Sequence, residues 1–187
     1  MNRPIPSGRL SLKTALLAGL CLLACCAPPS ASLPPSLQRP DIPYDLESLF
    51  HLEPFGRPGL DEGFGKNAAV VTAISNLSCG TCVSRELKRI QAMSVAHGER
   101  LDFVLVVSGE DEYYLRNLRR VGRIRFPILL GRAPGPSTQK PDQMTIDLID
   151  KNRRRLIYRF TPYPGPECAG DFQVFQTRAL HYLEGAR

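Results

Sequence analysis

Apolar and polar positions alternate along the chain in a way that predicts strands and helices in turn. Two nearly continuous apolar runs, residues 68–74 and 101–107, are typical of strands covered on both faces of a sheet. Residues 82–97 between them repeat apolar side chains at helical spacing, and Gly98 provides a helix stop. The side chains of this helix divide into an apolar face (Val83, Leu87, Ile90, and Met93 or Val95) and residues expected to face water (Arg85, Glu86, Lys88, Arg89).

A second helix is predicted directly after the strand at 101–107. Ser108 is a candidate cap, and the acidic residues that follow it suit the positive end of a helix. Its expected apolar face consists of Tyr114, Leu115, Leu118 and Val121. The remaining elements are a short apolar run at 126–130, a hairpin of 145–150 with 155–160, and a last helix over 171–184. This order predicts an α/β domain with a central mixed sheet and helices on both faces.

The start of the chain has the pattern of an export signal. Residues 1–24 combine a basic beginning without acids and an apolar run too short for a comfortable membrane span. The run ends in Leu22-Leu23-Ala24-Cys25, which resembles the lipidation site of bacterial lipoproteins, with Cys25 as the lipid-bearing residue. An unlipidated signal or an uncleaved anchor is the alternative. The residue after Cys25 is Cys26 and not Asp, the usual residue that retains such lipoproteins in the inner membrane. Its identity favours an outer-membrane anchor on the periplasmic side of the cell envelope.

Prolines dominate the stretch that follows this signal. We expect residues 25–44 to form an extended, Pro-rich tether and residues 45–187 to form the folded domain. Without residues 1–24 the formal net charge falls from +6 to +3, because Arg3, Arg9 and Lys13 are removed. A mildly basic chain with no long basic block gives no indication of nucleic-acid binding.

A Cys-x-x-Cys pair, Cys79-Gly80-Thr81-Cys82, lies between the first predicted strand and the helix after it. Two thiols at this spacing can close a small disulfide ring, and a helix N-terminus lowers a thiol pKa. The context therefore predicts a redox-active pair. A disulfide that only staples a loop is the competing interpretation in an exported protein.

In this arrangement the chain resembles the thioredoxin superfamily, and within it the membrane-tethered TlpA/redoxin-like branch. The resemblance rests on Val70-Val71-Thr72-Ala73-Ile74 leading into the cysteine pair, and on Thr145-Ile146-Asp147-Leu148-Ile149-Asp150 followed by a basic turn and a strand. It implies a thioredoxin-like fold and a thiol–disulfide oxidoreductase without a cofactor. Cys79 would attack the disulfide of an exported partner and Cys82 would resolve the intermediate, with reduction of the partner slightly favoured.

Three departures from the pattern of the superfamily bear on this expectation. Ser78 stands where Trp often precedes the first cysteine, and Ala73 stands where many thioredoxins carry a buried acid. A cis-proline normally lies opposite the cysteine pair, and three positions compete for its place: Pro127, taken as the candidate substrate-binding residue, Pro141 and Met144.

The remaining chemistry-bearing residues support fewer hypotheses. His51, His97 and His181 are not in ligand spacing with the pair, so no metal site is predicted. Cys168 lies in a Pro/Gly-rich segment and is expected to be incidental, with an extra redox thiol as the alternative. The leading hypothesis is an envelope oxidoreductase acting on exported proteins with thiols or disulfides. The runner-up is a non-catalytic thioredoxin-fold binding module, or one that handles copper.

Overall fold

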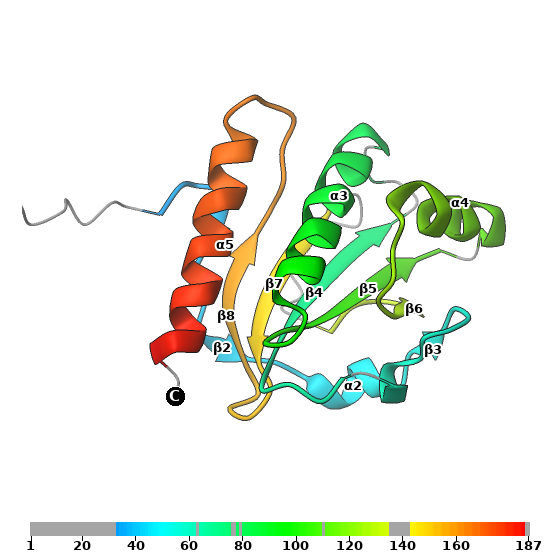
Figure 1. Cartoon of the computed structure of the whole chain (residues 1–187), viewed down its shortest axis with the longest axis horizontal. Coiled ribbons are helices and arrows are strands. Elements are labelled where there is room, and N and C mark those ends of the chain that lie inside the picture. The colour runs from blue at the N-terminus through cyan, green and yellow to red at the C-terminus, as the bar shows by residue number, and fades with distance from the viewer. Residues whose placement is uncertain are drawn as a thin grey trace, which may run out of the picture. The chain divides into compact units, whose positions relative to one another are not determined.

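A single mixed sheet forms the centre of the described part of the chain. The computed structural model describes residues 33–62, 64–75, 78, 80–109, 111–134 and 143–185. Its helices are α2 (Leu46–Phe50), the 3-10 helix η1 (Leu60–Glu62), α3 (Gly80–His97), α4 (Glu112–Gly122) and α5 (Cys168–Gly185) (Figure 1). Its strands are β1 (Leu37–Gln38), β2 (Ile42–Pro43), β3 (Glu53–Pro54), β4 (Ala68–Ser75), β5 (Asp102–Ser108), β6 (Ile128–Leu130), β7 (Thr145–Asp150) and β8 (Arg155–Phe160).

The strand order fixes which ends of the strands lie together. The order is β1-β8-β7-β4-β5-β6-β3, and β2 also pairs with β8. β4, β5 and β6 run parallel to one another. β7 is antiparallel to β4, and β8 is antiparallel to β7. Ser75 is opposite Ser108, and Ala73 is opposite Thr145. The ends of β4 and β5 and the start of β7 therefore meet at one end of the sheet, which we call the carboxyl end.

Alternating side chains of β4 pack into two different core clusters. Val70 and Ile74 belong to the larger cluster, together with buried side chains of α3, α4 and α5. Ala69 and Val71 belong to the smaller cluster, together with Leu49 of α2. Figure 1 shows α3 and α5 in front of the sheet. The expected α/β architecture, a mixed sheet with helices on both faces, is confirmed.

The described unit begins before the expected boundary at residue 45. Leu37 of β1 and Tyr44, just after β2, are buried, and both strands pair with β8. The prolines in 33–44 thus belong to edge strands and turns, where a missing N–H costs little. Both core clusters of the described residues lie within the compact unit 33–187.

Two helices begin at residues other than those predicted. Asp111 caps α4 by accepting a hydrogen bond from the Tyr114 backbone N–H (3.1 Å). Ser108, the predicted cap, remains in β5, where its hydroxyl donates to the Gly131 carbonyl (3.0 Å). Val121, predicted to lie on the apolar face of α4, is half exposed. Val95, the alternative to Met93 on the apolar face of α3, is exposed, whereas Met93 is buried. α5 begins at Cys168 rather than at Asp171.

Candidate functional site

The connection from β4 to α3 is closed by two serines. The Ser78 N–H donates to the Ser75 carbonyl (3.0 Å), and the Ser75 N–H donates to the Ser78 hydroxyl (3.1 Å). Ser78 is nearly buried at this turn. A small hydroxyl residue at the position where the superfamily often has Trp therefore fixes how the chain turns from the sheet into α3.

Cys82 lies in the first turn of α3, at the carboxyl end of the sheet. Gly80 is the first residue of this helix, and Cys82 is partly exposed. Cys79 immediately precedes Gly80 in the chain and lies outside the described residues. Backbone N–H groups at the start of a helix favour a thiolate over a thiol. The position of Cys82 agrees with the strand–pair–helix context that the sequence predicted.

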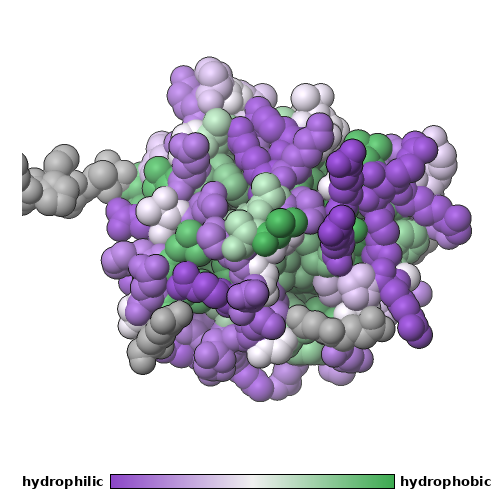
Figure 2. Space-filling view, in the orientation of Figure 1, coloured by the Kyte–Doolittle hydropathy of each residue, from purple (hydrophilic) through white to green (hydrophobic). Residues whose placement is uncertain are grey.

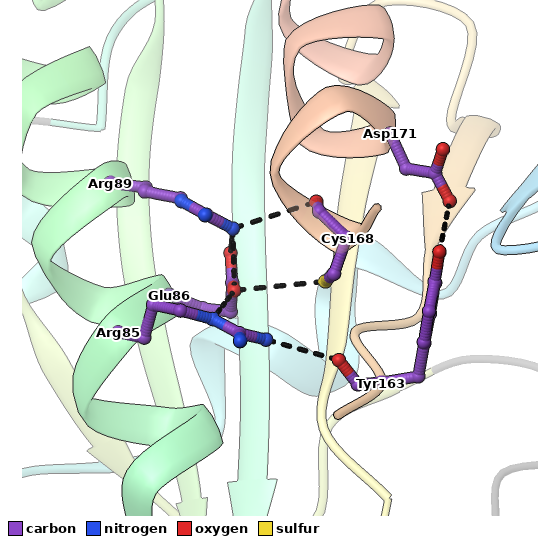
Figure 3. Close-up of polar contacts among 6 residues, drawn as sticks. All are labelled: Arg85, Glu86, Arg89, Tyr163, Cys168 and Asp171. Carbon is purple, nitrogen blue, oxygen red and sulfur yellow. Dashed lines mark hydrogen bonds and ion pairs between the residues drawn. The ribbon is translucent and has the colours of Figure 1, made fainter. Parts of the chain in front are cut away.

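Glu86, one helical turn after Cys82, is completely buried. Its carboxylate accepts hydrogen bonds from Arg85 Nε (2.8 Å) and Arg89 Nη1 (2.7 and 3.0 Å). The thiol of Cys168, also fully buried, donates to the same carboxylate with a sulfur–oxygen distance of 3.8 Å. We call Arg85, Glu86, Arg89 and Cys168 the Glu86 cluster (Figure 3).

The Glu86 cluster joins α3 to the beginning of α5. Arg85 Nη2 donates to the Tyr163 carbonyl (3.0 Å), and Arg89 Nη1 donates to the Cys168 carbonyl (3.5 Å). The Tyr163 hydroxyl in turn donates to Asp171 (3.1 Å) (Figure 3). Side chains of α3 thus hold the segment that leads into α5. α3 and α5 are connected through polar contacts as well as through the core.

The charges in this cluster do not cancel. Two guanidinium groups face one carboxylate, which leaves the cluster formally positive close to the start of α3. The hydrogen bond to Glu86 raises the pKa of Arg85, burial opposes this shift, and the charge of Glu86 supports it. Arg85 is therefore a charged group three residues after Cys82 in the same helix.

A second polar group lies on the other side of Tyr163. An open pocket of about 560 Å³ is lined by Pro35, Ser36, Gln38, Gln143, Thr145, Arg159, Thr161, Tyr163 and Asp171. Within it, Arg159 forms a buried bidentate ion pair with Asp147 (2.7 and 2.6 Å). Burial raises the pKa of Asp147, while the guanidinium of Arg159 opposes that shift. Because Thr145 begins β7, this pocket lies at the carboxyl end of the sheet.

The other predicted site residues have different outcomes. Cys25 and Pro141 lie outside the described residues. Pro127 precedes β6 and its carbonyl accepts from Leu105 of β5 (2.9 Å). Within the described ranges the cis peptide bond is Arg57–Pro58, so Pro127 does not meet the expectation of a cis-proline. Met144 is buried directly before β7, which pairs with β4.

The contacts of Glu86 and Cys168 differ from those that the sequence pattern predicts. Glu86 was expected to face water because it is charged, but it lies three residues after Val83 and four before Ile90, inside the apolar stripe. This position within the apolar stripe is the sequence signal that indicates burial of Glu86. Cys168 was expected to be incidental, yet it is the first residue of α5 and contacts Glu86.

The described residues contain neither a cluster of metal ligands nor a membrane-spanning helix. In these ranges no three His, Cys, Asp or Glu side chains are grouped so that they could hold a metal ion. None of the helices among them has the length and apolar character required to cross a membrane.

Comparison with solved structures identifies the fold as thioredoxin-like. A candidate protein disulfide isomerase from Bacteroides thetaiotaomicron superimposes with a TM-score of 0.52 and 12% identity, covering 71% of this chain and 84% of that one. Peroxidoxin BcpB from Mycobacterium tuberculosis gives a TM-score of 0.49 at 17% identity, covering 73% and 92%. A candidate thiol:disulfide interchange protein DsbE from Chlorobium tepidum gives 0.44 at 20% identity, covering 71% and 94%. No protein-family model and no curated protein matches the sequence.

Proposed function

We propose that the protein is a thiol–disulfide oxidoreductase that uses Cys79 and Cys82 as its redox pair. The observation that supports this most directly is the position of the Cys-Gly-Thr-Cys segment, which spans the junction between β4 and α3. Cys82 lies in the first turn of α3, where a helix N-terminus favours a thiolate, and Cys79 is the residue before Gly80 in the sequence. The thioredoxin-like fold agrees with this assignment, and the neighbour from Bacteroides thetaiotaomicron is described as a candidate protein disulfide isomerase.

The proposed reaction is a two-step exchange. The thiolate of Cys79 attacks one sulfur of a partner disulfide, forms a mixed disulfide and releases the other partner sulfur as a thiolate. Cys82, as thiolate, then attacks the sulfur of Cys79 and releases the second partner sulfur. The products are a Cys79–Cys82 disulfide and a reduced partner, so two electrons pass from the protein to the partner. The reverse sequence would oxidise a partner dithiol.

The Glu86 cluster supports the second step of this reaction. Arg85, held by Glu86 and by the Tyr163 carbonyl, adds positive charge beside Cys82. A thiolate at Cys82 is the attacking species when the mixed disulfide is resolved. We assign Glu86 the part of a positioning residue that acts through Arg85.

We further propose that the partners are exported proteins with thiols or disulfides. The basic and apolar residues 1–24 and the site ending in Cys25 favour a lipid-anchored protein of the cell envelope, on the periplasmic side and preferably at the outer membrane. In an oxidising compartment of this kind, a dithiol that reduces partners requires a separate source of electrons.

Trapping of mixed disulfides tests the proposed roles of the two cysteines. Cys82→Ser is expected to accumulate covalent complexes through Cys79, which disappear on treatment with a reducing agent. Cys79→Ser is the matched control, because it retains one thiol of the pair but lacks the attacking sulfur. Equal trapping by both variants, or by neither, contradicts the assignment. Stoichiometric copper binding by a reduced protein that traps no partner would instead favour the binding-module hypothesis.

A further inference from the structure

Three exposed arginines follow one another closely at the end of α4 and form no ion pair with a carboxylate of the described residues. Arg116 pairs with Glu112 (2.6 Å), and Arg119 donates to the carbonyls of Arg57 (2.7 Å) and Phe55 (2.8 Å). Arg120, Arg123 and Arg125 are exposed, and no carboxylate among the described residues forms an ion pair with them. Arg120 contacts the side chain of Asn117 (3.4 Å).

The turn that ends α4 explains why these cations stay on the surface. Arg123 has a left-handed backbone (φ 50°), and its N–H donates to the carbonyls of Arg119 and Arg120 as the helix C-cap. Beyond the cap, buried Ile124 and Phe126 alternate with exposed Arg123 and Arg125. The chain therefore directs its apolar side chains into the core and its cations to solvent.

Exposed apolar side chains accompany these cations on α4. Tyr113 is 79% exposed and Val121 is 50% exposed, whereas Leu115 on the inner side of the helix is buried. Tyr113, Asn117, Arg120 and Val121 are spaced by four, three and one residues, so they share the outward face of the helix. Figure 2 shows strongly hydrophilic side chains over α4, on the right of the view. We call Tyr113, Arg120, Val121, Arg123 and Arg125 the α4 basic surface.

We propose that the α4 basic surface docks on anionic phospholipid headgroups. Arginines that have no carboxylate partner are available for lipid phosphates, and polybasic surface segments are attracted to anionic leaflets. Tyrosine suits the headgroup level of a bilayer, because its ring is apolar and its hydroxyl is polar. The combination of cations with exposed Tyr113 and Val121 favours a lipid surface over an acidic protein.

The predicted lipid anchor would hold the folded domain close to a bilayer. Seven residues, 26–32, separate Cys25 from Leu33, and the eight chain steps between these two residues span about 28 Å when extended. A domain tethered at this range has a high effective concentration at the membrane, so a weak surface contact suffices to orient it. The proposal does not depend on the thiol chemistry, and its test requires no anchor.

Vesicle binding by residues 33–187, the compact unit that holds both described core clusters, tests the proposal. The vesicles contain equal amounts of phosphatidylglycerol and phosphatidylcholine, or phosphatidylcholine alone. Arg120→Gln/Arg123→Gln/Arg125→Gln is expected to reduce the partition onto anionic vesicles about tenfold or more. Circular dichroism verifies that each variant is folded. Tyr113→Ala is expected to reduce the partition about threefold without changing the net charge.

The turn between β7 and β8 offers a control with the same loss of charge. Arg153, Arg154 and Arg155 each pair with a carboxylate, of Asp150 (3.8 Å), Glu47 (2.9 Å) and Asp41 (2.7 Å). Their replacement by Gln is expected to leave binding to anionic vesicles within about twofold of the unmodified protein. Equal loss in both triple variants would show that net charge alone acts, and would overturn the proposal.

Two other outcomes also overturn it. One is equal binding to vesicles with and without phosphatidylglycerol, or to neither kind. The other is binding of a polyglutamate peptide through the same three arginines in the absence of vesicle binding, which would assign the α4 basic surface to an acidic protein.

Discussion

Glu86 combines complete burial with partners that are only partly buried. The Arg85 and Arg89 side chains are 34% and 25% exposed, whereas that of Glu86 is 0% exposed. Loss of the charge leaves two arginines that water can solvate only in part. We expect Glu86→Gln to lower the free energy of unfolding by about 2 kcal/mol, measured by urea denaturation at neutral pH.

An exposed ion pair provides the comparison for that variant. Glu112 and Arg116 are 64% and 72% exposed, so Glu112→Gln is expected to cost no more than about 0.5 kcal/mol. Similar losses in the two variants would mean that burial of the Glu86 cluster does not contribute as described.

Arg85 connects this cluster with the redox pair. In a Cys79→Ser background, Arg85→Gln is expected to slow alkylation of Cys82 at neutral pH about threefold, because less thiolate is present. Peptide mass spectrometry separates Cys82 from buried Cys168. Lys88→Gln removes an exposed positive charge about one turn further along α3 and is expected to change the rate little. An unchanged rate in Arg85→Gln would contradict an electrostatic role.

Tyr44 is a buried residue whose hydroxyl has no hydrogen-bond partner among the described residues. Its burial, followed by the charge of Asp147, raises the pKa of this phenol well above the ordinary value. In the unfolded chain tyrosine ionises near pH 10, so above about pH 10 the unfolded state loses a proton that the folded state keeps. The free energy of unfolding therefore falls as pH rises through this range.

Tyr44→Phe separates this contribution from those of the other tyrosines. At pH 7 the variant is expected to be equally stable or more stable by up to about 1 kcal/mol, because it buries no unsatisfied hydroxyl. Between about pH 9 and 11 it is expected to lose less stability than the unmodified protein. Parallel urea titrations at the two ends of this range measure the difference. A steeper loss in the variant would contradict the burial of a neutral phenol.

At the scale of elements, Asp111 determines where α4 begins. Its carboxylate accepts from the Tyr114 N–H (3.1 Å), and Asp111→Ala is expected to cost about 1 kcal/mol. Asp111→Asn retains an oxygen acceptor and is expected to cost a few tenths of that value. Thermal unfolding followed by circular dichroism distinguishes them. Equal stability of both variants would indicate that the cap contributes nothing.

Long apolar runs made the central elements predictable from the sequence. β4, β5, β7 and β8 were expected within about a residue of their observed bounds, because each is buried and its hydrophobic run is continuous or strongly alternating. β1, β2 and β3 have two residues each, too few to produce a period. They exist because longer strands offer them partners, and such pairing cannot be read from a local pattern.

The candidate site was predictable only in part, for a similar reason. The cysteine spacing and its place between strand and helix are local features, so the redox pair could be proposed directly. Glu86 and Cys168 are separated by 82 positions in the chain, and their contact depends on how α5 packs against α3. Charge alone suggested an exposed Glu86, although its place within the apolar stripe indicated burial.

At the scale of the whole molecule, the sheet places the start of α3 and a polar pocket at the same end. Tyr163 lies between them, since its carbonyl accepts from Arg85 and its hydroxyl donates to Asp171, which lines the pocket. The proposed redox pair is therefore connected to α5 and to the segment at Ser36, whose hydroxyl also donates to Asp171 (2.6 Å). β1, whose Leu37 pairs with Phe160, completes this end of the fold.

The reduction potential of the Cys79–Cys82 pair tests the central claim most directly. The protein is equilibrated in buffers of defined thiol–disulfide ratio, and alkylation with peptide mass spectrometry measures the fraction of the pair that is oxidised. A reversible two-electron transition between about −270 and −120 mV, the range of catalytic dithiols, is the predicted result. A pair that forms no disulfide, or one that stays oxidised below about −300 mV as structural disulfides do, would contradict the account.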